Sequence, residues 1–174
     1  MAVNVSPVQL SRRNLGAHFL GLAGSSAWPQ FGLEMEITEE TMLEDPQALL
    51  HTLQILRSTG VRIAIDDFGM GYSSLGRLSQ LPVDTLKIDR AFTSRLTGDR
   101  AGRAIVSTII TLAHLLELDT VAEGVETLEQ LALLDTLGCA QSQGFLHSPP
   151  VPADLFETML AANVRGAGSV GAIL

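Results

Sequence analysis

The sequence predicts an α/β fold, an incomplete TIM-like (β/α) barrel of about six βα units. Short apolar runs alternate with longer amphipathic segments along the 174 residues, and this alternation is typical of parallel strands joined by right-handed helical crossovers. A complete eight-stranded barrel of about 250 residues uses about 31 residues per unit. Six units make about three-quarters of a modified eight-stranded barrel, and we expect the two other units to precede Met1. An open doubly wound sheet is the alternative.

The predicted strands are apolar runs that end in polar, mostly acidic residues. Ile63-Ala64-Ile65, for example, leads directly into Asp66 and Asp67. A doubly wound sheet would gather its polar residues at one switch point, whereas here they follow almost every strand, which favours the barrel. We expect strands, in chain order, at 2–6, 32–37, 61–66, 84–88, 119–123 and 139–144.

The predicted helices lie between these strands. Leu49, Leu53 and Leu56 form an apolar stripe at helical spacing, with Pro46 in the first turn and Gly60 at the stop. The helix after the fourth strand is apolar nearly all round and should be well buried. We expect helices at 7–22, 45–59, 72–80, 99–117, 127–137 and 152–164.

Composition and charge exclude several functions. The formal net charge is −8 and 5% of the residues are aromatic, which argues against DNA or single-stranded nucleic acid as a partner. No apolar run reaches the roughly 18 residues that a membrane span needs. Cys139 is the only cysteine, which fits a cytoplasmic protein. We predict one truncated domain at 1–164 and a flexible Gly-rich tail at 165–174.

Adjacent carboxylates mark the candidate site. Asp66 and Asp67 repel each other, and burying either one alone is costly, so a bound divalent cation is the usual reason to keep such a pair. A solvated turn is the alternative for this pair taken alone. Glu36 and Glu123 stand at the ends of other strands, so we expect a metal site at the mouth of the barrel. Glu34, two residues before Glu36, should face the same way and be paired.

Six separate motifs, in this order and at this spacing, resemble those of the EAL domain, the cyclic di-GMP phosphodiesterase of bacteria. The resemblance covers roughly residues 2–160. The motifs are Asn4-Val5-Ser6-Pro7, Glu36-Ile37-Thr38-Glu39, Asp66-Asp67-Phe68-Gly69-Met70-Gly71-Tyr72-Ser73-Ser74-Leu75, Leu81-Pro82-Val83-Asp84-Thr85-Leu86-Lys87-Ile88-Asp89, Ala122-Glu123-Gly124-Val125-Glu126-Thr127 and Gln143-Gly144-Phe145.

The resemblance implies hydrolysis of cyclic di-GMP to the linear dinucleotide pGpG, with two Mg²⁺ or Mn²⁺ ions that activate a water for in-line attack on the phosphodiester. Asp66 resembles the aspartate that bridges the two ions. The full set of residues that resemble metal ligands is Asn4, Glu36, Asp66, Asp67 and Glu123.

The resemblance also implies catalytic and supporting roles. Glu123 is similar to a glutamate proposed as general base, and Lys87 to the lysine that orients the attacking water. Glu126 and Gln143 resemble supporting catalytic residues, and Asp66 and Gln143 are the expected substrate contacts. The glutamate that anchors the gating loop at 68–75 has its counterpart at the end of the second motif, in Glu39.

Two departures from the family pattern stand out. The Glu-Ala-Leu segment that names the family is absent and is expected before Met1, and Met70 replaces the commoner threonine in the gating loop. By resemblance, the expected partners are cyclic di-GMP, a second copy in a homodimer, and upstream sensory or cyclase domains of a longer protein. The alternative functions are an impaired member that binds cyclic di-GMP or a protein without cleavage, and a fragment that needs the missing strands to fold.

Overall fold

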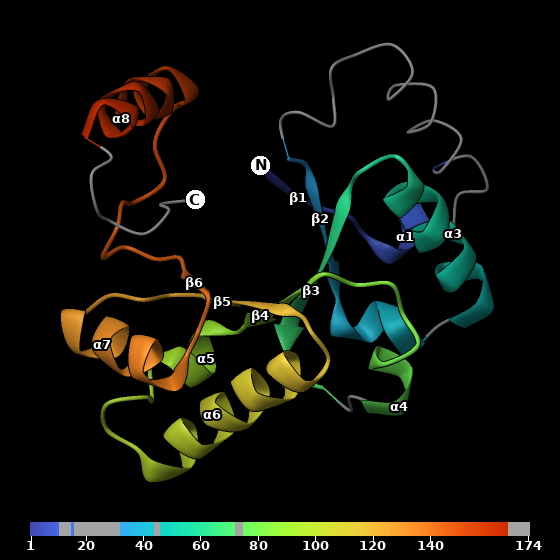
Figure 1. The fold of residues 1–174 in the computed structure, drawn as a ribbon, viewed down its shortest axis with the longest axis horizontal. Coiled ribbons are helices and arrows are strands. Elements are labelled where there is room, and N and C mark those ends of the chain that lie inside the picture. The colour runs from blue at the N-terminus through green and yellow to red at the C-terminus, as the bar shows by residue number, and fades with distance from the viewer. Residues whose placement is uncertain (11–14, 16–31, 44–45, 72–74, 167–174) are drawn as a thin grey trace.

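The computed structural model describes residues 1–10, 15, 32–43, 46–71 and 75–166, and the six strands of this part form one parallel sheet (Figure 1). The sheet keeps the chain order from β1 to β6, so each described strand pairs with its neighbours in sequence. This uninterrupted strand order is that of a barrel. The described strands show no reversal of strand order such as a doubly wound sheet has. The half-barrel comprises β1 Ala2–Asn4, β2 Glu34–Thr38, β3 Arg62–Phe68, β4 Thr85–Ile88, β5 Asp119–Ala122 and β6 Gln141–Ser142.

Helices alternate with the strands, as the sequence predicts. α3 packs against β3, and α6 packs against β4 and β5. Polar caps set their ends, since the Asp99 side chain accepts a hydrogen bond from Ala101 at the start of α6, and Thr127 and Gln130 form a capping box on α7. The helices are α1 Pro7–Leu10, the 3₁₀ helix η2 Glu39–Leu43, α3 Pro46–Ser58, α4 Leu75–Leu78, α5 Arg90–Thr93, α6 Arg100–Leu115, α7 Leu128–Leu137 and α8 Ala153–Gly166.

The helices differ from the predicted ones in a few places. The sequence does not predict η2 and α5, because elements of four or five residues are too short to show a helical period. The predicted helix at 7–22 lies mostly outside the described residues, and α4 is described from residue 75 onward. α8 continues to Gly166, two residues into the predicted tail, and 167–174 lie outside the described part of the chain.

Alternation along the strands gives the sheet an apolar outer face and a polar inner face. Leu53 and Leu56 of α3 and Ile110 of α6 pack against the outer face, and all three are almost fully buried. The buried outer-face residues are Met35, Ile37, Ile63, Ile65, Leu86 and Ile88.

No helix of the described part is long and apolar enough to cross a membrane.

The first residues of four consecutive strands form a polar layer on the inner face, which we call the amino-end layer: Glu34, Arg62, Thr85 and Asp119. Arg62 pairs with Asp119, and its Nε lies 3.4 Å from Glu34 Oε2. Thr85 Oγ1 accepts a hydrogen bond from Arg62 Nη2 at 3.1 Å and donates one to Glu34 Oε2 at 2.8 Å. The hydrogen bond to Asp119 is the main reason that the pKa of Arg62 is raised. The expectation that Glu34 is paired is confirmed.

Candidate metal centre at the carboxyl ends of the strands

A buried lysine lies at the centre of the candidate site. Lys87 of β4 is 4% exposed. Its Nζ lies 2.6 Å from Glu36 Oε1, 2.7 Å from Glu123 Oε1 and 3.1 Å from Asp66 Oδ1. The three carboxylates come from β2, from the residue after β5, and from β3, so one ammonium joins four consecutive strands. We call these four residues the lysine cluster.

Strand register brings the lysine cluster together. Glu36 pairs with Ala64, so Asp66 lies two residues further toward the carboxyl end, on the same face of the sheet. Lys87 lies level with the residue two positions before Glu123. Steps of two residues preserve the face in a β-strand, so all four side chains point inward at the same rim. This is the rim at which (β/α) barrels carry their active sites.

Asp67 joins the cluster through a local irregularity. Simple alternation would turn Asp67 away from Asp66, but the β3–β4 register shifts between Ile65 and Phe68, and Asp67 has a φ of 55°. Its N–H donates to Asp66 Oδ1 at 3.1 Å. Oxygen atoms of Asp66, Asp67 and Glu123 consequently lie within 4.8 Å of one another, close enough to share a metal ion.

The charges of the site are unbalanced. Four carboxylates face one ammonium, a formal charge of −3. Burial is the main cause that raises the pKa of Glu123, and Asp66 and Glu36 raise it further, whereas Lys87 opposes them. Burial by itself would lower the pKa of Lys87, but the hydrogen bonds to Glu123 and Glu36 raise it above its usual value. Lys87 therefore stays a cation, and the remaining negative charge favours a divalent cation.

The chemistry of these donors fits the expected ions. Carboxylate oxygens are the hard ligands that Mg²⁺ and Mn²⁺ prefer, and the described cluster contains no thiol or imidazole that would select zinc. Asn4 lies on β1 in register with Glu36, at the same rim, where its amide oxygen could add a ligand.

Glu39 makes the backbone contacts expected of a loop anchor. It is 5% exposed, and its Oε2 accepts hydrogen bonds from Gly69 N at 3.0 Å and Gly71 N at 3.2 Å. A Cβ atom on Gly71 would lie 2.9 Å from Glu39 Oε1, so the backbone approaches this carboxylate closely. The gating of substrate by this loop stays a prediction, and its residues 72–74 lie outside the described part.

Two predicted site residues are not part of the lysine cluster. Glu126 pairs with Arg90, whose Nη2 lies 2.6 Å from Glu126 Oε1. Gln143 is exposed beyond β6, and its backbone carbonyl accepts a hydrogen bond from Val125 at 3.0 Å. Glu126 lies three residues after Glu123, and Gln143 follows β6, the strand that pairs with β5. Their supporting roles stay predictions.

No role is predicted for Asp89 from the sequence. Its Oδ1 accepts a hydrogen bond from Ala91 N at 2.7 Å, which caps α5. Burial, then the charges of Asp66 and Asp89, raise the pKa of Asp67, and a hydrogen bond between Asp67 and Asp89 adds to the rise. Asp89 directly follows the apolar run of β4. This position in the sequence could have identified Asp89, because Asp66 was identified by the same position after an apolar run.

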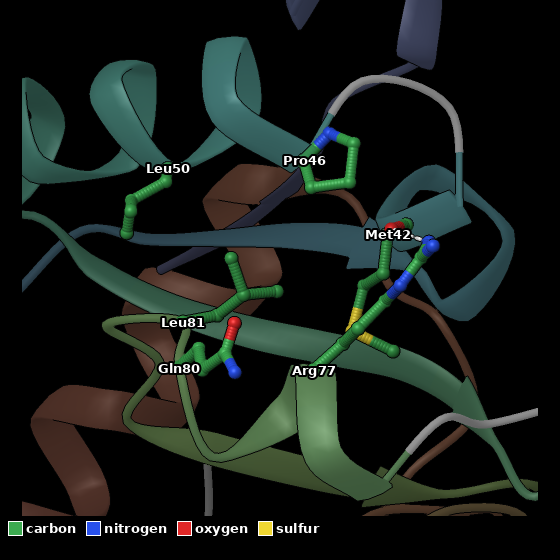
Figure 2. A pocket seen from close by; sticks show the side chains of 6 residues that line it. All are labelled: Met42, Pro46, Leu50, Arg77, Gln80 and Leu81. Carbon is green, nitrogen blue, oxygen red and sulfur yellow. Dashed lines mark hydrogen bonds between the residues drawn. The ribbon is translucent and has the colours of Figure 1, made fainter.

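A small open pocket lies away from the lysine cluster, between η2, α3 and α4 (Figure 2). Arg77 Nη1 donates to the Met42 carbonyl at 3.1 Å beside it. The residues that line it include no carboxylate. The lining residues are Met42, Pro46, Leu50, Arg77, Gln80 and Leu81.

The fold and site together define a (β/α)-barrel protein with an acidic, lysine-centred cluster at the carboxyl ends of its strands, where three carboxylates lie close enough to share a metal ion. Residues 1–150 match the family model of the EAL domain. The chain belongs to the EAL domain family.

Two similar proteins come from Pseudomonas aeruginosa. The bifunctional diguanylate cyclase/cyclic di-GMP phosphodiesterase MucR is 44% identical over 154 residues, which is 88% of this chain and 22% of MucR. The cyclic di-GMP phosphodiesterase RocR is 38% identical over 156 residues, 90% of this chain and 40% of RocR. The chain thus spans less than half the length of these relatives.

Solved structures of the family share the fold. The complex of the MucR phosphodiesterase with c-di-GMP superposes with a TM-score of 0.82 at 44% identity, over 89% of this chain and 63% of that one. Klebsiella pneumoniae BlrP1, in a complex with manganese and cyclic di-GMP, gives a TM-score of 0.76 at 32% identity, over 86% of this chain and 38% of that one. These likenesses agree with the half-barrel described above.

Proposed function

We propose that this chain carries a metal-dependent phosphodiesterase site that hydrolyses cyclic di-GMP to pGpG. The observation that carries the proposal is the lysine cluster, in which one buried ammonium contacts three carboxylates while Asp67 completes a group of oxygens able to hold a metal. The activities of MucR and RocR, and the manganese in the BlrP1 complex, support the choice of substrate and ion.

The carboxylates have two tasks in this proposal. Two divalent ions, when bound, would lower the pKa of a water and neutralise phosphate charge. Glu123 accepts the proton of the attacking water as general base, which its raised pKa favours. The proposed ligands of the ions are Asn4, Glu36, Asp66, Asp67 and Glu123.

Lys87 has an electrostatic task. As a permanent cation held in place by three carboxylates, it is positioned to orient the water and to stabilise negative charge that develops during attack. We propose that Gln143 and Asp66 contact the substrate, that Glu126 supports the loop after β5, and that Glu39 holds the loop beginning at Phe68.

The test is turnover of cyclic di-GMP by the purified chain with Mg²⁺ or Mn²⁺, followed by chromatography of pGpG. Glu36→Gln keeps the shape of the side chain and removes its charge, so we expect turnover to fall at least a hundredfold, on the order of a lost electrostatic contact in an active site. Glu40→Gln is the matched control because Glu40 is exposed and adjacent to the same strand.

Two results would contradict the proposal. Equal turnover by Glu36→Gln and the parent would separate the activity from the lysine cluster. A folded parent that binds cyclic di-GMP in calorimetry but forms no pGpG would replace hydrolysis with binding, the alternative function of an impaired family member.

A further inference from the structure

An exposed arginine holds the loop that follows Glu123. Arg90 is the first residue of α5 and lies three residues after Lys87. Its guanidinium pairs with Glu126 at 2.6 Å, and the two side chains are 63% and 43% exposed. The aliphatic part of Arg90 covers Gly124, since a Cβ atom built there would lie 2.3 Å from Arg90 Cγ and 2.9 Å from its Cδ.

The loop under Arg90 has little freedom. Gly124 has a φ of 64°, a left-handed conformation that glycine adopts without strain. The arginine stem occupies the place of a side chain at Gly124, and its head holds Glu126 two residues later. Glu123 immediately precedes the stretch from Gly124 to Glu126 that Arg90 contacts. Its carboxylate contacts Lys87 and lies near Asp67.

We infer that Arg90 is a positioning residue for the Glu123 carboxylate. The stretch from Lys87 to Arg90 then fixes Glu123 from two directions: Lys87 binds its carboxylate, and Arg90 restrains the backbone that follows it. The inference rests on the proposed function, because it concerns the geometry of the metal site. Arg90 touches neither the metal oxygens nor the lysine cluster in any described contact, so its effect passes through the loop.

The stability and the metal affinity of Arg90 variants, measured together, distinguish a positioning role of Arg90 from a general structural role. An ion pair this exposed contributes little to folding, and Gln130 independently holds the loop's far end through the Glu126 and Thr127 amides. Removing the positive charge of Arg90 would, by charge alone, tighten binding of a cation. A weaker metal affinity in an equally stable variant therefore reports lost geometry.

The experiment measures Mn²⁺ affinity by electron paramagnetic resonance of the free ion, with thermal unfolding of the metal-free protein alongside. Arg90→Ala removes stem and charge, and we expect Mn²⁺ affinity to fall about tenfold, as for loss of a residue that supports a metal ligand. Arg90→Lys keeps stem and charge and should restore most of the affinity. The melting temperature should stay within about 2 °C of the parent for both variants.

Arg95 provides the matched control. It also pairs with a carboxylate, Asp99, and also covers a glycine, since a Cβ atom on Gly102 would lie 2.7 Å from Arg95 Cβ. It lies between α5 and α6 rather than beside Glu123. Arg95→Ala should leave Mn²⁺ affinity unchanged.

The outcomes separate the two proposals. If the parent binds Mn²⁺ and Arg90→Ala binds it as tightly, the positioning role is refuted and the metal site stands. The role is also refuted if Arg90→Lys loses as much affinity as Arg90→Ala, or if Arg95→Ala loses as much. If the parent itself binds no Mn²⁺ while folded, the proposed function fails, and the positioning role fails with it.

Discussion

Replacing Lys87 by methionine should show how much of the fold depends on the buried ammonium. Methionine keeps an unbranched apolar side chain but removes the charge that contacts Glu36, Asp66 and Glu123 at 2.6–3.1 Å. Removing one partner of a buried ion pair costs about 3–5 kcal/mol, because the other charges remain buried and unpaired. Since Lys87 is 4% exposed, we expect a loss in that range in the free energy of unfolding of the metal-free protein at neutral pH.

The assay is urea denaturation of the parent and of Lys87→Met, followed by circular dichroism. Arg57→Met is the control because the Arg57–Asp84 pair, at 2.7 Å, leaves the arginine side chain half exposed. An exposed pair contributes about 0–1 kcal/mol, so this variant should unfold close to the parent.

Acidity and metal ions should both reduce the penalty of Lys87→Met. The pKa of Glu123 is already raised by burial, and removal of the lysine raises it further. A carboxyl group with a raised folded-state pKa binds more protons folded than unfolded, so its destabilising effect is present above the folded pKa and fades as the pH falls through it. Mn²⁺ should stabilise the variant more than the parent, because the ion replaces the missing cation. A loss below about 1 kcal/mol at neutral pH would refute the reasoning.

Three further predictions test the loop, the site and a helix end. Gly71→Ala places a Cβ atom 2.9 Å from Glu39 Oε1, so we expect faster proteolysis near this loop and a loss of about 1 kcal/mol, measured by urea denaturation. On acidification, Mn²⁺ affinity should begin to decline at a higher pH than it would for carboxylates of ordinary pKa, because the pKa values of Glu123 and Asp67 are raised. Calorimetry in buffers of different ionisation enthalpy should show proton release on binding. An affinity independent of pH would contradict this. Gly138→Ala should cost about 1 kcal/mol in thermal unfolding, because the residue ends α7 with a φ of 81°; an unchanged melting temperature would contradict the assignment of that cap.

The main features of the fold follow from the sequence because parallel strands in a barrel are short, buried and terminated by polar residues. The same rule predicts that Glu36, Asp66 and Glu123 meet at one rim, and the lysine cluster confirms that meeting. The central place of Lys87 agrees with a charged residue inside an otherwise apolar strand.

Other features depend on distances that no local pattern encodes. Arg90 and Glu126 are 36 residues apart, and their pairing follows from the approach of α5 to the loop after β5. The inward turn of Asp67 depends on a register shift and a positive φ, which alternation alone would not predict. η2 and α5 are only five and four residues long, too short to show a helical period, and α5 is fixed by its Asp89 cap.

The amino-end layer has a consequence for the shear of the barrel. If one strand slipped by a single residue, Arg62 or its partners would move to the outer face, and a slip of two residues would separate Arg62 from Glu34 and Asp119. The layer therefore acts against sliding of β2 to β5 past one another. Each strand has a nearly fixed rise per residue. Alignment of the first residues of the strands therefore also sets the level at which the carboxylates lie at the opposite rim.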